Sequence, residues 1–120
     1  MVPSTPIIYV DTPQSLGQAV AHLSASARFA FDLEFDSSRY SYGFTLCLIQ
    51  VCTAETCFII DPLVGLDLAP LYDLFRDANK QKVAHCSDQD LRLLHLLGCR
   101  PQNVEDTETM AKLLNYERFG

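Results

Sequence analysis

The sequence contains no run of apolar residues long enough to cross a bilayer, and no repeat, low-complexity segment or linker interrupts it. Its first residues, Met1 to Pro6, lack the basic segment and the following apolar segment that together mark a signal peptide. We therefore expect a cytoplasmic protein that has no membrane partner.

Positive charge is also scarce, because 9 Lys and Arg residues face 15 Asp and Glu residues. The resulting net charge of -6 and the pI of about 4.8 argue against a protein that grips nucleic acid by bulk electrostatic attraction. Any polyanionic partner would have to be held locally or through divalent cations.

The cysteine content does not suggest a disulfide framework, because the chain has an odd number of cysteines, five, and they lie within apolar segments. We expect them to be small core side chains in a reducing environment. Cys47, Cys52 and Cys57 recur every five residues, which raises the possibility of a zinc site. We reject that site because an offset of five along a strand places neighbours on opposite faces.

What the chain does have is the composition of one globular domain, with 120 residues of which 48% are hydrophobic and 20% charged. Asp11 or Thr12 can cap a helix that begins with Pro13, and Gly98 can end a later one. Periodicity and turn residues predict the following elements. We expect strands at 7–10, 28–34, 45–52, 57–60, 82–85 and 104–106, and helices at about 13–25, 68–75, 87–97 and 107–114.

The order of these elements predicts an α/β fold. The loops between the strands at 28–34, 45–52 and 57–60 are too short for helical crossovers, so these strands should form an antiparallel meander. Helices and strands then alternate. A mixed sheet with helices packed on it follows from this order.

The first stretch that carries chemistry is Phe29 to Asp36, an apolar strand in which two carboxylates appear. Asp32 and Glu34 should point to one face of the strand, with Leu33 turned to the core. Two like charges this close repel each other unless a cation sits between them. A strand end that runs into a polar loop explains an isolated Asp-x-Glu equally well, so the interpretation depends on a third carboxylate.

That carboxylate is Asp90. A strand that ends at His85 and a helix that begins near Ser87 would place Asp90 in the first helical turn, above the strand ends where α/β active sites collect. Asp88 is two residues away and cannot share a helix face with Asp90. We interpret Asp88 as a surface carboxylate favoured by the helix dipole.

Five short motifs follow one another along the chain: Asp32-x-Glu34, Leu46-Cys47-Leu48-Ile49-Gln50, Ile60-Asp61-Pro62-Leu63, Val83-x-His85-x-x-x-x-Asp90-Leu91 and Asp106-Thr107. From about Ile7 to Gly120, the chain resembles the ribonuclease D branch of the DEDD 3′-5′ exonucleases. The resemblance implies a ribonuclease H-like fold and a nuclease that removes nucleotides from the 3′ end of RNA or single-stranded DNA.

The same resemblance implies two bound divalent ions, Mg²⁺ or Mn²⁺, which hard carboxylate oxygens suit. Asp32 is then the carboxylate that bridges both ions, Glu34 a ligand of the ion that holds the attacking water, and Asp90 a ligand of the second ion. The candidate substrate contacts are Leu33, Phe35, Tyr42 and His85. Competing structural interpretations are that the loop aromatics cover a core edge and that His85 is simply hydrogen-bonded at a strand end.

One family motif has no counterpart here: a Tyr or His followed four residues later by Asp. The residue four after His95 is Cys99, and the residue four after Tyr116 is Gly120. We therefore interpret residues 1–120 as the N-terminal part of an exonuclease domain, truncated at the C-terminus, with an exposed flank that promotes self-association. The competing function is a catalytically incomplete module that binds nucleic acid or a partner.

Overall fold

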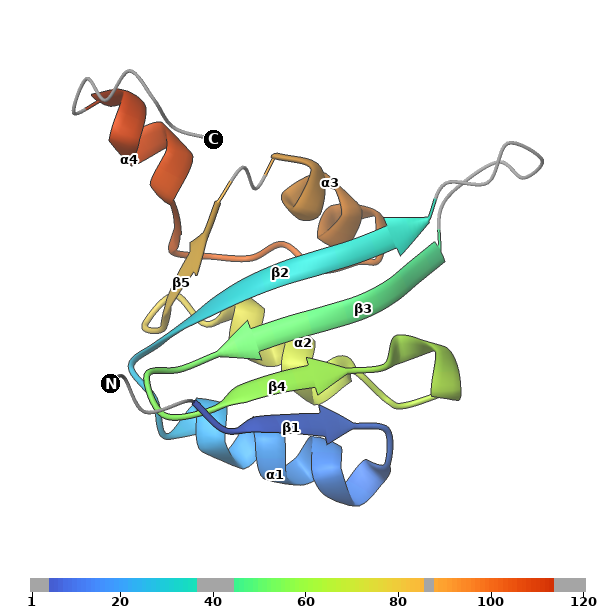
Figure 1. Ribbon diagram of the computed structural model, residues 1–120. Helices are drawn as coiled ribbons and strands as arrows, with labels where there is room; N and C mark the ends of the chain where they lie inside the picture. The colour runs from blue at the N-terminus through green and yellow to red at the C-terminus, as the bar shows by residue number, and fades with distance from the viewer. Residues whose placement is uncertain (1–4, 37–44, 86–87, 114–120) are drawn as a thin grey trace.

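The computed structural model describes residues 5–36, 45–85 and 88–113 and shows a single mixed sheet with helices packed against it (Figure 1). The strands are β1 (Ile7–Val10), β2 (Arg28–Asp36), β3 (Thr45–Cys52), β4 (Cys57–Ile60), β5 (Gln81–Ala84) and β6 (Val104–Asp106). The helices are α1 (Pro13–Ser24), the 3₁₀ turn η1 (Pro62–Val64), α2 (Ala69–Arg76), α3 (Asp88–Leu96) and α4 (Thr107–Leu113).

The strand order is β1-β4-β3-β2-β5-β6. The pairs β2/β3 and β3/β4 are antiparallel, whereas β1 joins β4, β5 joins β2, and β6 joins β5 in parallel. The antiparallel meander and the mixed α/β sheet are thereby confirmed. β5 pairs with β2 only as far as Ala30, so the second half of β2 has no strand on that side among the described residues.

One face of the sheet packs against α1 and α2, which lie behind the sheet in Figure 1. Phe75 of α2 makes T-shaped contacts with Phe29 and Phe31 of β2, and the ring centroids lie 5.4 Å and 5.0 Å apart. Residues of opposite parity point to the other face, which we call the open face. It carries the side chains of Tyr9, Asp32, Glu34, Leu48, Gln50, Cys52 and Ile59.

The start of α1 follows from its sequence. Thr12 is the N-cap, and its hydroxyl accepts a hydrogen bond from the backbone N–H of Ser15 while the Ser15 hydroxyl accepts one from the N–H of Thr12. Pro13 occupies the first turn, where it loses no helical hydrogen bond. The capping prediction is confirmed for Thr12 and not for Asp11.

β2 extends two residues beyond the predicted end at Glu34, because Asp36 still pairs with Thr45 of β3. The register shifts between Glu34 and Phe35, which marks a bulge at the carboxylate pair. The turn η1 was not predicted. Asp61 caps it, since its Oδ1 accepts a hydrogen bond from the backbone N–H of Leu63.

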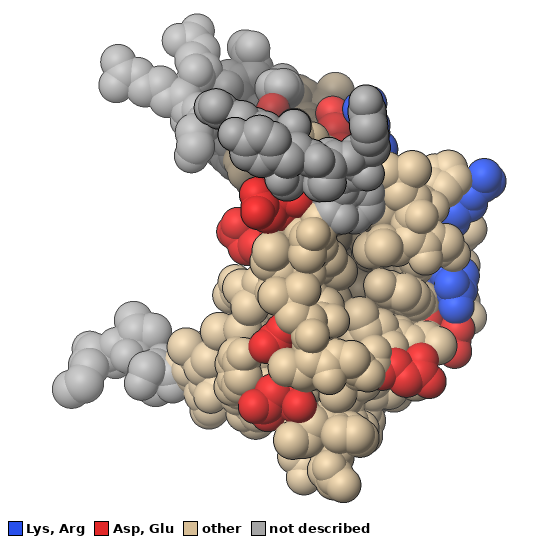
Figure 2. All heavy atoms as spheres, turned by 90° about the vertical axis from the view of Figure 1, so that its right-hand side faces the viewer, with Lys and Arg blue, Asp and Glu red and all other residues tan. Residues whose placement is uncertain are grey.

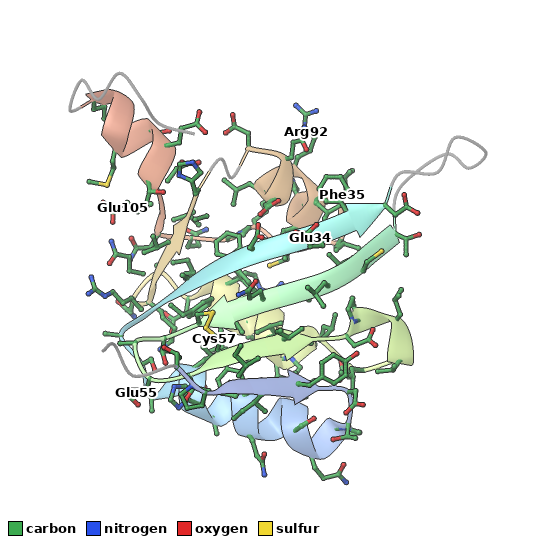
Figure 3. All side chains as sticks on the ribbon, viewed as in Figure 1. Glu34, Phe35, Glu55, Cys57, Arg92 and Glu105 are labelled. Carbon is green, nitrogen blue, oxygen red and sulfur yellow. A yellow bond between two sulfur atoms is a disulfide. The ribbon has the colours of Figure 1, made fainter. Side chains whose placement is uncertain are left out.

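The cysteines require a correction. Cys52 and Cys57 are joined by a disulfide, drawn as a yellow bond in Figure 3, and are not both free thiols as expected. They lie on two different strands, β3 and β4, and are direct partners across the antiparallel pair. The sequence argument assumed that both cysteines lie on one strand, where an offset of five separates the side chains. The turn at 53–56 instead places Cys57 on a second strand, directly beside Cys52.

Two lysines are buried, which the sequence did not predict. Lys82 is fully buried in β5, and its ammonium donates to the backbone carbonyls of Asp77 and Lys80 at 2.5 Å and 2.7 Å. Burial lowers the pKa of Lys82. Lys80 similarly donates to the carbonyls of Ser24 and Ser26, where α1 ends. Both lysines thus tie loop carbonyls to the sheet.

Within the described ranges, none of the helices has the length and apolar character that crossing a membrane requires.

Candidate functional site

Asp90 meets the strand that carries the other two predicted carboxylates. It lies in the first turn of α3 with only 7% of its surface exposed. Its Oδ2 accepts a hydrogen bond of 3.3 Å from the backbone N–H of Leu33, the residue between Asp32 and Glu34. This N–H is available because β5 stops pairing with β2 at Ala30. Segments 57 residues apart in sequence are thereby joined at the edge of β2.

Asp32 and Glu34 are exposed and lie on the open face, whereas Leu33 between them is buried. The alternation along β2 explains this arrangement, since successive side chains point to opposite faces. Figure 3 labels Glu34 toward the carboxyl end of β2. The core side of β2 therefore anchors the strand, and the open side presents both carboxylates.

The electrostatics of the site act most strongly on Asp90. The pKa of its carboxyl group is raised from 3.8 to about 6, mainly by burial and to a smaller extent by the nearby charges of Asp32 and Glu34. The hydrogen bond from Leu33 opposes this shift. The three carboxylates thus share one electrostatic environment, in which an added cation would lower the free energy of the charged forms.

The donor chemistry of these residues fits a hard divalent cation, because Asp32, Glu34 and Asp90 offer only carboxylate oxygens. The buried Asp90 carboxylate, disfavoured in its charged form, supports this fit. In the part of the chain that the structure describes, however, no three His, Cys, Asp or Glu side chains stand in position to hold a metal ion.

The predicted substrate contacts differ from one another in their burial. The Leu33 side chain lies in the core at 4% exposure, as the alternation along the strand predicted, and its backbone N–H donates to Asp90. Phe35 is partly buried against the core. His85 is exposed at the end of β5, with its Nδ1 and the Thr107 hydroxyl 2.8 Å apart. Tyr42 lies outside the described residues.

Asp106 caps helix α4. Its Oδ1 accepts hydrogen bonds from the backbone N–H groups of Glu108 and Thr109, at 2.9 Å and 3.4 Å, in the first turn of α4. Thr107 connects this turn to β5, because its hydroxyl donates to the carbonyl of Ala84. The Asp106-Thr107 motif thus joins α4 to the strand end near His85.

A small hollow beside Asp32 contains a residue to which sequence reasoning assigned no role. Its volume is about 140 Å³, and it is lined by Ala30, Phe31, Asp32, Gln50 and Cys52. Gln50 lies directly opposite Asp32 in the β2/β3 register. The signal that would have identified Gln50 is this register, which the sequence does not reveal because the bulge shifts it between Glu34 and Phe35.

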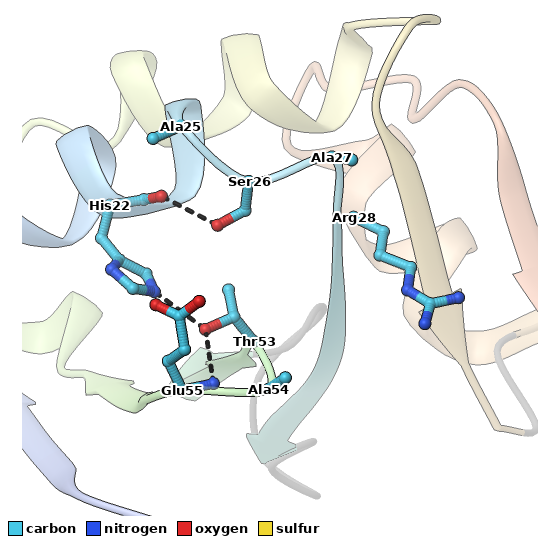
Figure 4. A pocket seen from close by; sticks show the side chains of 8 residues that line it. All are labelled: His22, Ala25, Ser26, Ala27, Arg28, Thr53, Ala54 and Glu55. Atoms are coloured by element: carbon cyan, nitrogen blue, oxygen red, sulfur yellow. Dashed lines mark hydrogen bonds between the residues drawn. The ribbon is translucent and has the colours of Figure 1, made fainter.

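A larger cavity, of about 470 Å³, lies away from the carboxylates, at the start of β2 and the turn between β3 and β4 (Figure 4). It is lined by His22, Ala25, Ser26, Ala27, Arg28, Thr53, Ala54 and Glu55. Nε2 of His22 lies 2.8 Å from the Thr53 hydroxyl across it. Its size does not make it the site, because none of the three predicted carboxylates borders it.

The surface reflects the acidic composition. Figure 2 shows Asp and Glu side chains spread over the side of the molecule that faces right in Figure 1, with Lys and Arg mainly toward one margin. A polyanion that approaches this side meets repulsion unless cations intervene.

Comparison with known proteins gives consistent matches. The profile of a 3′-5′ exonuclease family matches residues 7–120. A ribonuclease D of Sphingobium indicum is 38% identical over 115 residues, which cover 92% of this chain and 29% of that protein. This chain spans only 13% to 29% of the length of the curated relatives that it matches, which include an RRP6-like protein of Arabidopsis thaliana and the exosome component 10 homologue of Caenorhabditis elegans.

Solved structures share the fold. The catalytic core of RRP6 from Trypanosoma brucei superposes with a TM-score of 0.87 at 31% identity, over 97% of this chain and 33% of that one. RNase D of Escherichia coli gives a TM-score of 0.82 at 30% identity, over 95% of this chain and 30% of that one.

Proposed function

Because the chain belongs to the 3′-5′ exonuclease family, we propose that it supplies the carboxylates of a metal-dependent nuclease that removes nucleotides from a 3′ end. The observation that supports this most directly is the hydrogen bond from Leu33 N–H to Asp90, which brings the third carboxylate to the Asp32–Glu34 strand.

In this proposal Asp32, Glu34 and Asp90 hold two Mg²⁺ or Mn²⁺ ions. Such ions, when bound, stabilise both the attacking and the leaving oxygen of an in-line displacement at phosphorus. The chain's own contribution is to concentrate negative charge at one strand edge and to fix Asp90 through Leu33. Bound cations would also offset the acidic surface and allow a polyanionic strand to approach.

We propose RNA as the substrate class, with single-stranded DNA as the alternative. The E. coli neighbour is described as an exoribonuclease involved in structured RNA processing, which supports RNA. In the proposal the substrate contacts remain Leu33, Phe35, Tyr42 and His85. This chain spans 30% of that neighbour.

The level of activity should be low for the 120-residue chain. After Asp90, no Tyr or His is followed four residues later by Asp, so the sequence lacks the group that the family uses to orient water. We therefore expect weak, Mn²⁺-dependent trimming that needs long incubation to detect. A module that binds single strands without cutting them is the second candidate, favoured by the same missing motif.

The decisive experiment follows mononucleotide release from a 3′-labelled single-stranded RNA in Mn²⁺. Asp32→Asn should abolish release, whereas Asp36→Asn, which removes an exposed carboxylate at the end of the same strand, should retain it. Release that continues in excess chelator would contradict the metal mechanism. Binding of the RNA without any release, by the native chain, would favour the non-catalytic module.

A further inference from the structure

Gln50 of β3 faces Asp32 across the antiparallel pair. Residues directly opposite in such a pair point to the same face, with Cβ atoms about 4.5–5.5 Å apart. Both side chains line the hollow of about 140 Å³ described above. An amide is therefore within reach of the carboxylate that is proposed to hold both ions.

The neighbours on this face make Gln50 distinctive. Ala30 is opposite Cys52, and Glu34 is opposite Leu48, so neither neighbouring pair offers an amide. A lysine at position 50 would neutralise Asp32 and repel a cation. An amide donates a hydrogen bond while leaving the full negative charge of Asp32 in place.

The present partner of Gln50 is a weak one. Its Nε2 donates to Sγ of Cys52 at 3.7 Å. Sulfur is a weak acceptor, whereas a hydrogen bond to a carboxylate is charge-assisted and about twice as strong as a neutral one. A carboxylate oxygen of Asp32 is therefore a stronger acceptor for the Gln50 amide than this sulfur is.

We propose that Gln50 is a positioning residue: its Nε2 donates to the Asp32 carboxylate and orients the other oxygen toward a divalent cation. This inference rests on the proposed function, because it assumes that Asp32 is a ligand. Groups that orient a ligand in this way commonly change metal affinity by about 10- to 100-fold when they are removed.

The test measures Mn²⁺ binding to the whole 120-residue chain by electron paramagnetic resonance of the free ion. Gln50→Leu should weaken Mn²⁺ binding by about 10- to 100-fold. Gln81→Leu is the matched control, since Gln81 is a partly buried strand glutamine whose Nε2 donates to Glu105. It should bind Mn²⁺ as the native chain does, even if it unfolds at lower urea concentration.

The outcomes separate this inference from the proposed function. Native affinity in Gln50→Leu, together with lost affinity in Asp32→Asn, would overturn the role of Gln50 alone. Native affinity in Asp32→Asn, or no Mn²⁺ binding by the native chain, would overturn both proposals. Should Gln50→Leu fail to fold by circular dichroism, Gln50→Met, which keeps an unbranched side chain without a donor, decides by the same affinity measurement.

Discussion

At the scale of single residues, Asp90 combines a destabilising environment with its proposed role. Its carboxyl group is buried, and the N–H of Leu33 only partly compensates for that burial. Because the pKa rises from 3.8 to about 6, the folded state binds the proton more tightly than the unfolded state does. The free energy of unfolding therefore falls as the pH rises from about 4 to about 6 and stays lowered above that range.

Asp90→Asn should remove this penalty while keeping an acceptor for the Leu33 N–H. We expect the variant to be more stable than the native chain at pH 8 by about 1–3 kcal/mol, the upper value being the whole pKa shift converted to free energy. The difference should vanish below about pH 3, where the carboxyl is protonated in both states because the pH lies well under the unshifted pKa of 3.8. Urea unfolding at several pH values, without divalent cations, measures it.

Asp88→Asn is the control for this prediction, since Asp88 is an exposed carboxylate in the same helical turn. It should leave the pH dependence unchanged. Added Mn²⁺ should stabilise the native chain and not Asp90→Asn, because a ligand that binds only the folded state raises stability by mass action. If Asp90→Asn is less stable than the native chain at pH 8, the Asp90 carboxylate stabilises the folded state and the prediction is wrong.

At the scale of elements, α1 depends on its capping box. Thr12→Ala removes the acceptor for the Ser15 N–H and should lower the free energy of unfolding by about 1 kcal/mol. Thr12→Asp supplies another capping oxygen and should restore it. Gln18→Ala, at an exposed position of the same helix, should change stability by less than about 0.5 kcal/mol. Thermal unfolding of the three variants checks the order, and equal stability of Thr12→Ala and native would contradict it.

The elements were largely predictable because their signals are local. The bounds of β1, β3 and β4 match the prediction, since β-branched and apolar runs lie between clear turn residues. The short loops were enough to predict the meander. The incorrect predictions depended on strand pairing. β2 extends to Asp36 because Asp36 pairs with Thr45 of β3, and Cys52 lies beside Cys57 because β3 and β4 are antiparallel neighbours.

The site was predictable only in part for the same reason. Period-2 alternation correctly placed Asp32 and Glu34 together on the strand face away from Leu33. The contact of Asp90 with Leu33 N–H depends on where β5 stops pairing, which no local pattern encodes. Gln50 required the cross-strand register, and the burial of Lys82 required knowledge of the carbonyls that surround it.

At the scale of the whole molecule, the sheet has unequal faces. Helices α1 and α2 cover one face, while among the described residues no helix covers the open face of β1 and β4 (Figure 1). β1 is also an edge strand, with Ile7 and Tyr9 exposed by 69% and 54%. An edge strand with apolar side chains favours pairing with another chain, which gives a route to self-association separate from the C-terminal flank expected from the sequence.

We therefore expect the 120-residue chain to self-associate as its concentration rises, as measured by sedimentation velocity. Ile7→Lys with Tyr9→Lys should weaken association by about tenfold or more, because a loss of only 1.4 kcal/mol in binding free energy is tenfold in affinity. Both positions point away from the helices, whereas Val10 stays in the core, so the fold should persist.

The matched control is Leu63→Lys with Val64→Lys, two side chains of η1 that are exposed by 61% and 52%. It adds the same charge and removes similar apolar surface, but it leaves β1 unchanged. If association is weakened equally by both pairs, general hydrophobicity and net charge drive it, and the edge strand has no special part. If the native chain stays monomeric at every concentration, β1 and the open face do not drive self-association in solution.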